Sequence, residues 1–403
     1  MFLIISTQVS YGKDTLRVMF YNLLNFPGTN PDRIDELKII LDHVKPDLLA
    51  VNELKDVDGA NDILANALNS NYKRATFTNG TDTDNMLFYN KEKIILHSQE
   101  EIYTSLRIIN HYKVFLNDPN LATTNDTVYL NIYSLHLKAG NSSDNEKTRL
   151  GEAHDLMDYI DNQTNGENIL IGGDFNFYSG KEPAYTYLTD SGNTVIYDPL
   201  NSPNDWNNNS TYASIHTQST RTTSLGDGGA TGGMDDRFDI IFTTGDILYT
   251  DNDLNYIANS YQSIGNDGNI FNSTITSTSA VTTTVADALH IMSDHLPIYM
   301  EIETAKNLTG IETLSTTQEG FKISYSVNNN QVQLNFNSRE NKAIITSVFS
   351  MSGSLIKSQT NNVQPGYSST TLTLPENVNT GLYFIHITDG KESWSKRLTY
   401  FHN

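Results

Sequence analysis

The segment Ile169–Asn176 reads ILIGGDFN and is the most informative stretch of the chain. Its first three residues are apolar and two glycines follow them, which is typical of a short buried strand. An acid and an amide, Asp174 and Asn176, come directly after this strand. In α/β proteins, functional side chains gather at the ends of buried strands. Asp174 and Asn176 are therefore candidate site residues.

Other apolar runs have polar residues at their ends in the same way. The runs at 18–21 and 48–52, the alternating segment 128–137 and the run beginning at 296 all show this pattern. Any one of these residues alone could be a surface carboxylate, a turn former or a core histidine. It is their joint occurrence at the ends of several apolar runs that indicates a functional site. The residues concerned are Asn22, Glu53, His136, Asp294 and His295.

Strand and helix patterns alternate through the first half of the chain. Strands are predicted at 16–23, 48–51, 86–89, 94–103, 128–137 and 169–171, and helices at 34–44, 63–68 and 147–160. From 201 to 287 the composition shifts to Asn, Ser, Thr, Gly and Asp, which predicts strands joined by long polar loops, with 238–243 as the clearest strand. The pattern predicts an α/β sandwich, in which two packed sheets carry helices on their outer faces.

The chain divides into segments of different composition. We expect a catalytic domain at 15–305, a linker at 306–319 and a β-domain at 320–403. The β-domain shows short strands at regular spacing with turn residues between them, which predicts an all-β sandwich. Residues 1–14 begin with an apolar run and continue with small and polar residues, which fits a truncated signal peptide or an apolar first strand.

The net charge of −21 is unevenly distributed. From Lys306 onward there are 8 basic and 6 acidic residues, whereas Met1–Ala305 holds 18 basic and 41 acidic ones. Such a surface argues against a protein that coats nucleic acid non-specifically, but a metal site can override the global field locally. The chain has no cysteine, which excludes disulfides and thiolate zinc sites. No run from Thr15 onward reaches the ~20 apolar residues of a membrane span, so stable membrane insertion is not expected.

The candidate residues have the chemistry that phosphodiester hydrolysis needs. Carboxylate and amide oxygens at Glu53, Asp294 and Asn22 are the ligands that Mg²⁺ or Mn²⁺ prefers. Asp174 can orient or deprotonate a water molecule, and Asn176 can hold that water or a phosphate oxygen. The Asp/Asn-rich loops are also candidate structural Ca²⁺ sites.

Two histidines complete this set. The imidazoles of His136 and His295 titrate near neutrality, so they can exchange protons or stabilise charge on a phosphate in the transition state.

Six motifs in this order resemble the endonuclease/exonuclease/phosphatase family, which includes deoxyribonuclease I, exonuclease III-type repair nucleases, neutral sphingomyelinases and inositol polyphosphate phosphatases. The resemblance extends over Leu16–Ile302 and implies a four-layer α/β sandwich of the deoxyribonuclease I type. The motifs are FYNLL at 20–24, DLLAVNE at 47–53, SLHLKAG at 134–140, GDFN at 173–176, RFDII at 237–241 and SDHLP at 293–297.

The resemblance implies a role for each matched position. It assigns the metal site to Glu53, with Asn22 and Asp294 lining it, and assigns the water and phosphate to Asp174 and Asn176. One departure is Asn52, since the family usually has Gln before the metal-binding Glu.

The remaining roles implied by the resemblance concern the histidines. His136 and His295 act as the acid–base and phosphate-contacting pair, and Asp239 supports the centre. Asn22, Asn176 and His295 are the expected substrate contacts. The family's carboxylate that buttresses the first histidine is matched by Asp82 or Asp84, between which the sequence does not choose. Arg149 is interpreted as a structural helix residue rather than a phosphate contact.

The C-terminal segment TGLYFIHI at 380–387, followed by Gly390 and the basic pair Lys396-Arg397, resembles the sorting domain of type IX secretion cargo in Bacteroidota. A carbohydrate-binding or fibronectin-like β-module is the alternative. The resemblance implies handling by the type IX secretion machinery and a secreted or surface-attached enzyme of a Gram-negative bacterium.

The motifs predict phosphoester hydrolysis but not the substrate. An extracellular nuclease acting on DNA or RNA is the first hypothesis, and a sphingomyelinase-like lipid phosphodiesterase or a small-molecule phosphatase is the second. A membrane-active member would carry an exposed aromatic hairpin, for which 255–285 is the candidate segment. A non-catalytic surface binding protein is the remaining alternative, and a monomer is the default assembly.

Overall fold

A computed structural model describes most of the chain, in two compact units, Thr15–Thr304 and a C-terminal unit within Ala305–Asn403. Apart from Asp14, Lys306 and Leu308, the predicted signal-peptide remnant at 1–14 and the linker at 306–319 lie outside the described residues. The described residues are 14–28, 33–118, 121, 127–163, 167–190, 193–249, 252–304, 306, 308, 321–328, 331–338, 341–350, 354–364, 366–375, 378, 381–389 and 393–400.

One sheet of the first unit has the strand order β11-β13-β1-β2-β4-β3, with β12 also paired to β13. Its central strands are nearly continuous apolar runs because both of their faces are covered. β1 pairs parallel with β2, and Asn22 lies opposite Asn52 in the register. The strands of this sheet are β1 (Asp14–Phe26), β2 (Leu48–Leu54), β3 (Tyr72–Arg74), β4 (Asp84–Asn90), β11 (Leu254–Tyr256), β12 (Gln262–Ser263) and β13 (Ile298–Thr304).

The second sheet has the order β5-β6-β7-β8-β10-β9. β7 and β8 are parallel, with His136 opposite Asp174, and β10 pairs antiparallel with β8, which sets Asp239 opposite Asp174. The strands are β5 (Ile94–Tyr103), β6 (Ile108–Leu116), β7 (Tyr129–His136), β8 (Ile169–Asp174), β9 (Ile196–Tyr197) and β10 (Asp239–Thr244).

The two sheets pack face to face, and glycines set their closest approach. A Cβ atom at Gly172 would lie 2.5 Å from the ring of Phe20, so Phe20 of β1 rests directly on the backbone of β8. At Gly173 the backbone has φ +136°, and a Cβ atom would lie 2.0 Å from the carbonyl oxygen of Leu135. Glycine is required here because a side chain would separate β8 from β7 or from the opposite sheet.

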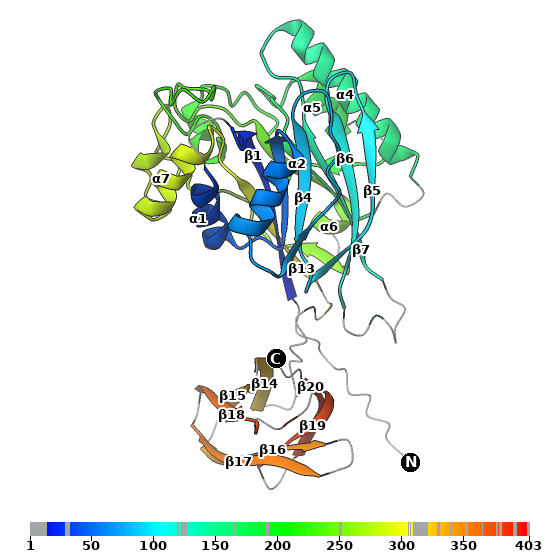
Figure 1. Ribbon diagram of the computed structural model, residues 1–403, viewed down its shortest axis with the longest axis vertical. Helices are drawn as coiled ribbons and strands as arrows, with labels where there is room; N and C mark the ends of the chain where they lie inside the picture. Colours follow the sequence, from blue (N-terminus) through cyan, green and yellow to red (C-terminus); the bar gives the residue numbers. More distant parts are fainter. Residues whose placement is uncertain are drawn as a thin grey trace. The chain divides into compact units, whose positions relative to one another are not determined.

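Helices cover the outer faces of the sheets (Figure 1). Ala153, Leu156 and Met157 of α4 pack with alternate residues of β7, β8 and β10 in one buried cluster. α1 and α7 lie against each other beside the first sheet. The predicted four-layer α/β sandwich is therefore confirmed. The helices are α1 (Ile34–Val44), α2 (Val57–Asp62), the π-helix η1 (Ile63–Ala67), α4 (Ser143–Asp161), α5 (Pro183–Asp190), α6 (Gly245–Tyr249) and α7 (Thr283–Met292).

In the region 201–287 the clearest predicted strand, 238–243, is confirmed as β10, but the rest of the region differs from its prediction. It contains α6, the first half of α7 and two short 3₁₀ segments, η2 (Ser210–Ile215) and η3 (Ile275–Ser277), and its strands β11 and β12 are only two or three residues long. The segment 255–285 forms no aromatic hairpin, since β11 and β12 each pair with β13 rather than with each other. Tyr261, one of its aromatic residues, is buried, and its hydroxyl oxygen accepts a hydrogen bond from the Ile241 N–H at 3.0 Å.

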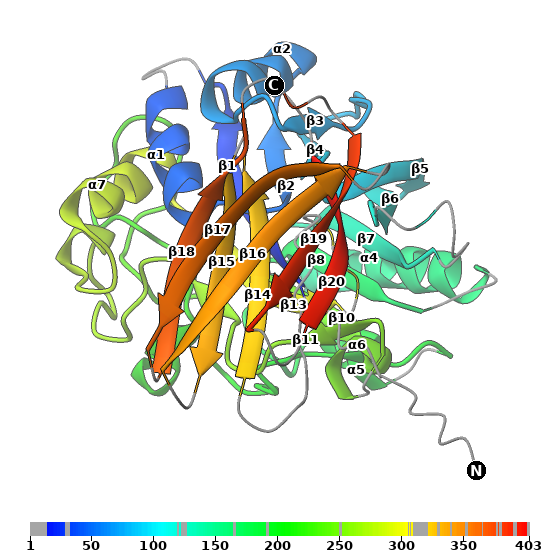
Figure 2. The ribbon, with the colours of Figure 1, turned by 90° about the horizontal axis from the view of Figure 1, so that it is seen from below.

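The C-terminal unit is a β-sandwich, as predicted (Figure 2). One sheet has the order β14-β15-β18 and the other β17-β16-β19-β20. Val332 and Leu372 from the first sheet and Ile344 and Ile385 from the second share one buried core. Strand β17 was not predicted from the sequence. The strands are β14 (Phe321–Asn328), β15 (Gln331–Ser338), β16 (Lys342–Ser350), β17 (Leu355–Val363), β18 (Gly366–Thr373), β19 (Gly381–Thr388) and β20 (Ser393–Tyr400).

Within the described part of the chain, none of the helices has the length and apolar character needed to cross a membrane.

Candidate active site

The predicted site residues meet at the ends of parallel strands from both sheets. Asn22 and Glu53 come from β1 and β2, and His136 and Asp174 from β7 and β8. The start of antiparallel β10 adds Asp239, and the segment between α7 and β13 adds Asp294 and His295. Parallel strands bring their carboxyl ends to the same edge, which is why residues as far apart in sequence as Asn22 and His295 become neighbours.

Asn22 links the two sheets through its side-chain amide. Its Nδ2 donates to Glu53 Oε1 and to Asp174 Oδ2, both at 3.0 Å. Its Oδ1 accepts from the Leu24 N–H at 2.9 Å. Because the oxygen faces the backbone and the nitrogen faces two carboxylates, Asn22 here orients Glu53 and Asp174 and offers no oxygen ligand.

Glu53 stands in a left-handed backbone conformation, with φ +57°. This turn at the end of β2 directs the carboxylate across to β7 and β8. Its Oε2 accepts from the Asn25 N–H at 2.9 Å. Ligand atoms of Glu53, His136 and Asp174 all lie within 4.8 Å of one another, a spacing that one divalent cation can bridge.

Asp174 is buried at the centre of the site. Burial, together with the neighbouring charges of Asp239 and Glu53, raises the pKa of its carboxyl group from 3.8 to about 7, although the charge of His295 opposes the rise. Its Oδ1 accepts from the Asn176 N–H at 2.9 Å. Asn176 itself has φ +52° and donates its side-chain amide to the Leu137 carbonyl at 3.2 Å.

His295 forms the other half of the site with Asp239 and Asp294. Its Nδ1 lies 2.8 Å from Asp239 Oδ2, and its Nε2 lies 3.7 Å from Asp174 Oδ2. Burial lowers the His295 pKa, but the carboxylates of Asp239, Asp174 and Asp294 outweigh burial and hold it well above its usual value. Asp294 accepts hydrogen bonds at Oδ2, while its buried Oδ1 has no partner among the described residues.

His136 lies between the carboxylates of Glu53 and Asp174. Its Nδ1 is 3.8 Å from Glu53 Oε1, and its Nε2 is 3.5 Å from Asp174 Oδ2. Burial lowers its pKa well below the usual value, and the nearby charges of Arg107, His295 and Lys138 lower it further. The ring is therefore a neutral base at physiological pH.

The predicted buttress of His136 is not observed. Asp82 forms an ion pair with Arg107 at 2.7 Å, and Asp84 accepts from the Gly80 N–H at 2.7 Å. In the described structure, the carboxylates within 4.0 Å of the His136 ring are those of Glu53 and Asp174. Asp82 reaches the end of β7 only through Arg107, which donates to the His136 carbonyl oxygen, and Asp84 at the start of β4 is held by the Gly80 N–H, so neither carboxylate meets the ring.

Arg149 occupies a structural position, in agreement with its interpretation from the sequence. The side chain is fully buried and pairs with Glu182 at 2.8 Å. It also donates to the carbonyl oxygens of Lys138 and Gly140 at 2.8 Å. The guanidinium thereby fixes the loop that follows β7.

A buried amide network beneath the site was not foreseen. Asn52 donates to Asn85 Oδ1 at 2.7 Å and to Ser134 Oγ at 3.2 Å, while Asn85 donates to Asn110 Oδ1 at 3.1 Å. Asn52, the departure from the family motif, is thus the residue that joins β2 to β4 and β7. Polar residues at inward-facing strand positions were the signal that could have revealed this network.

Gln218 was also missed, although it contacts two of the predicted residues. Its Nε2 lies 3.0 Å from Asp294 Oδ2 and 2.7 Å from His295 Nε2. It lies in a polar segment without periodicity, where no pattern distinguishes it from its neighbours.

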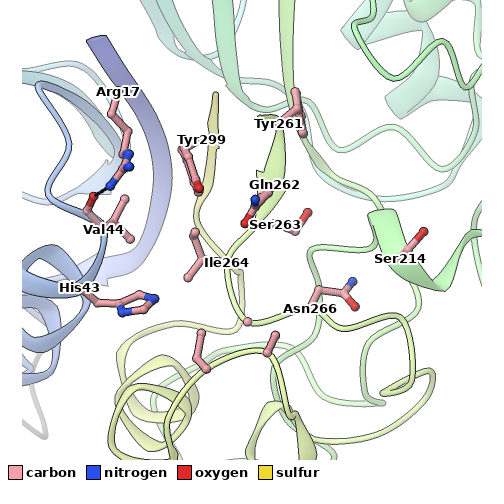
Figure 3. A pocket seen from close by; sticks show the side chains of 13 residues that line it. Arg17, His43, Val44, Ser214, Tyr261, Gln262, Ser263, Ile264, Asn266 and Tyr299 are labelled. Atoms are coloured by element: carbon pink, nitrogen blue, oxygen red, sulfur yellow. Dashed lines mark hydrogen bonds between the residues drawn. The ribbon is translucent and has the colours of Figure 1, made fainter. Parts of the chain in front are cut away.

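Two cavities of about 370 Å³ each lie in the catalytic unit. One is lined by Leu24, Asn25, Arg33 and Lys55 and adjoins Glu53, since Asn25 also contacts Glu53. The other is lined by Arg17, Tyr299 and further residues, shown in Figure 3. Arg17 precedes Asn22 by five residues of a strand, or about 16 Å, so the second cavity lies away from the candidate site.

The sequence comparison identifies the family. Residues 19–295 match the family model described as endonuclease/exonuclease/phosphatase family. The chain belongs to the endonuclease/exonuclease/phosphatase family. Its relatives hydrolyse phosphoric esters, so the carboxylates and histidines described above stand in a phosphoesterase fold. Residues 328–400 match the model of a secretion system C-terminal sorting domain, which indicates secretion or attachment at the cell surface.

Three solved structures are similar to this chain at low sequence identity. An endonuclease/exonuclease/phosphatase protein from Beutenbergia cavernae DSM 12333 is 11% identical, with a TM-score of 0.42 over 95% of this chain and 100% of that chain. TDP2 from D. rerio, complexed with a single-strand DNA product, is 16% identical, with a TM-score of 0.49 over 72% and 99%. The human Nocturnin catalytic domain with bound sulfate is 17% identical, with a TM-score of 0.44 over 72% and 97%. No curated protein sequence matches the chain significantly.

The raised pKa of Asp174 predicts how the stability of this family member depends on pH. The folded state holds a proton on Asp174 up to about pH 7, whereas the unfolded chain releases it near 3.8. The folded state therefore binds more protons in this window, and the free energy of unfolding falls as pH rises from about 4 to about 7. Asp236, whose pKa burial raises to about 6, contributes with the same sign.

Thermal midpoints measured in chelator between pH 4 and 8 test this expectation. The decline toward pH 7 should be shallower in Asp174→Asn than in the wild type, because only the Asp174 contribution is removed. Parallel curves for the two proteins would contradict the assignment.

Proposed function

We propose that the chain is a secreted, divalent-metal-dependent phosphodiesterase that hydrolyses nucleic acid. The observation that carries the proposal is the convergence of Glu53, Asp174 and His136 with the His295–Asp239 pair at one edge of the two sheets. Asp174 connects the two halves, since both histidines lie within 4.0 Å of its Oδ2.

The donor set fits a hard cation such as Mg²⁺ or Mn²⁺. Glu53 supplies a half-buried carboxylate, and Asp294 supplies a buried Oδ1 that has no hydrogen-bond partner among the described residues. A buried carboxylate oxygen without a partner is costly unless a cation or a donor meets it. Glu53 and Asp294 would hold the metal, and Asn22 would hold Glu53 in place. When bound, such a cation neutralises charge on a phosphate oxygen.

Proton transfer is assigned to residues already in contact. Asp174, whose pKa is about 7, can accept a proton from the attacking water near neutral pH. Asn176 restrains Asp174 through its backbone N–H. His295, held by Asp239, can donate a hydrogen bond or a proton to the phosphate, since neighbouring carboxylates raise its pKa. His136 stays neutral and can stabilise the water on the other side of Asp174.

Cations next to the site favour a polyanionic substrate. Arg107 donates to the carbonyl oxygens of His136 and Leu137 at 3.4 and 3.2 Å, and Lys138 follows directly. Lys55 lines the cavity beside Glu53. In a domain with a large acidic excess, cations at the rim give a local attraction for phosphates. A lipid phosphodiesterase is the weaker candidate, because 255–285 lacks the hairpin that would insert into a membrane.

The C-terminal unit completes the proposal. A sorting domain of the type IX kind would deliver the catalytic unit to the cell surface or the medium. There an enzyme that turns over nucleic acid would recover phosphate and nucleotides. The Asp/Asn-rich loops remain proposed Ca²⁺ sites, and the monomer remains the proposed assembly.

Metal-dependent hydrolysis by the purified full chain tests this function. We expect nicking of plasmid DNA or degradation of RNA with Mg²⁺ or Mn²⁺ and none with EDTA. Glu53→Gln should lower kcat by about 10- to 100-fold at subsaturating metal and regain part of it at high metal, because a neutral amide is a weaker ligand than a carboxylate. Glu92→Gln, the same change at an exposed position, should match the wild type.

Other outcomes separate the alternatives. Hydrolysis of sphingomyelin or of small phosphoesters alone would retain the phosphoesterase chemistry and overturn the substrate assignment. Absence of hydrolysis on every phosphoester with either metal would support a non-catalytic binding protein.

A further inference from the structure

Gln218 places one amide group against two residues of the proposed site. Its Nε2 lies 3.0 Å from Asp294 Oδ2 and 2.7 Å from His295 Nε2. The backbone of Gln218 is also fixed, because it forms isolated β-bridges with Asp236 and with His295. The side chain therefore leaves a well-anchored segment and ends between a candidate metal ligand and a candidate acid–base residue.

The donors and acceptors around Gln218 determine how its side-chain amide is oriented. The carboxylate of Asp294 can only accept, so the Gln218 atom 3.0 Å away must be the nitrogen. The same nitrogen lies 2.7 Å from His295 Nε2 and donates its second proton there when the ring is in its neutral form. The opposite orientation would set the amide oxygen 3.0 Å from a carboxylate oxygen of Asp294, an acceptor against an acceptor. Asp294 thus fixes the amide, and the amide in turn fixes the ring.

The other contacts of these residues complete the arrangement. Asp294 Oδ2 also accepts from the Ala230 N–H at 2.7 Å, so both of its donors converge on one oxygen and Oδ1 stays without a partner. His295 Nδ1 meets Asp239 Oδ2 at 2.8 Å. Gln218 is the one group in the described structure whose side chain bonds to both Asp294 and His295.

We propose that Gln218 is a positioning residue that holds Asp294 with Oδ1 free for the cation and holds His295 with Nε2 facing Asp174. The inference rests on the proposed function, since it assigns Gln218 a role through Asp294 and His295. It adds a residue that no family motif of this chain contains. Without the amide, Asp294 keeps the Ala230 N–H as its donor and can rotate about that bond, and the ring keeps its hydrogen bond to Asp239 but loses the one that fixes Nε2.

Gln218→Met tests the role because methionine keeps the length of the side chain and removes the donors. Loss of a group that orients a metal ligand costs about 10- to 100-fold in metal affinity or activity. We expect Mn²⁺ affinity of the metal-stripped full chain, measured by calorimetry without substrate, to fall in this range. With saturating Mn²⁺, kcat should still be lowered while KM changes less than twofold, because His295 remains misplaced.

Two further variants show whether the donors act through Asp294. Gln218→Glu should be no better than Gln218→Met, because it sets a second acceptor against Asp294 Oδ2. In an Asp294→Asn background, Gln218→Met should change Mn²⁺ affinity by less than twofold. Gln262→Met, the same replacement at an exposed residue of β12, should behave as the wild type.

The outcomes are distinguishable from a failure of the proposed function. If the wild-type chain binds no Mn²⁺ and hydrolyses no phosphoester, both the proposed function and the role of Gln218 are contradicted. An active wild type with Gln218→Met unchanged in Mn²⁺ affinity and kcat would overturn the inference alone. A rise confined to KM would also overturn it, since Gln218 would then contact substrate and position nothing.

Discussion

Asp174→Asn is expected to lower kcat by about 10²- to 10⁴-fold, the contribution of a positioned acid–base group. Asparagine has the same shape but cannot accept a proton from water. In the wild type, Asn22 Nδ2 and both histidine rings lie next to the Asp174 carboxylate. In the variant, a neutral amide oxygen or an N–H donor would take the place of that charged oxygen. Steady-state hydrolysis at pH 7 with saturating metal measures the loss.

The same variant should not be less stable above pH 7. The wild type must hold a buried carboxylate there, and burial disfavours its charge; the neutral amide does not carry this cost. A fall in activity with an unchanged or raised thermal midpoint would therefore separate lost chemistry from lost folding. Asp190→Asn, on an exposed residue of α5, is the matched control. Retention of more than a tenth of wild-type kcat by Asp174→Asn would remove Asp174 from its proposed role.

Arg237→Met is expected to have the largest effect on folding, a loss of about 3–5 kcal/mol in the free energy of unfolding. Arg237 is fully buried and forms two bonds with Asp198, at 2.7 Å to Oδ2 and 2.9 Å to Oδ1. Attraction to Arg237 outweighs the burial of Asp198 and holds the Asp198 pKa below its usual value. Methionine would leave that carboxylate buried without its cation.

Urea unfolding of the full chain, followed by far-ultraviolet circular dichroism, measures this loss in the transition of the catalytic unit. Arg74→Met, at a position only partly buried, should cost less than about 1 kcal/mol. The double variant Arg237→Met with Asp198→Leu should recover part of the stability, because apolar replacement of both partners of a buried pair is often tolerated. A single-variant loss below about 1 kcal/mol would show that the pair is not needed for folding.

The position of Arg237 makes this stability effect relevant to the site. Arg237 comes two residues before Asp239, which holds His295. In the sequence analysis, Arg237 is the first residue of the RFDII motif, and only Asp239 of that motif is assigned a role. Its role follows from Asp198, which lies 39 positions away in the chain and could not be recognised without the fold.

The candidate residues on the central strands could be predicted because local sequence fixes them. β1, β2 and β8 are apolar runs whose burial is nearly complete, and Asn22, Glu53 and Asp174 lie at their ends. The secondary structure from 201 to 287 was predicted less accurately, because the many polar residues there obscure the apolar periodicity of α6 and α7. Apolar residues of α7 such as Val285 and Leu289 do show helical spacing, but Thr- and Ser-rich surroundings obscured it.

The sequence by itself determined the order of strands and helices in the first half, the family, the β-rich C-terminal unit and the kinds of polar residue at the strand ends. These depend on local apolar periodicity and on motifs read along the chain. Only the tertiary structure decided that Asn22 presents its nitrogen, that neither Asp82 nor Asp84 supports His136, and that Gln218 joins Asp294 to His295. The reason is physical, since hydrogen bonds and pKa values depend on distances of a few ångströms between distant segments, and those distances are set by how the two sheets pack.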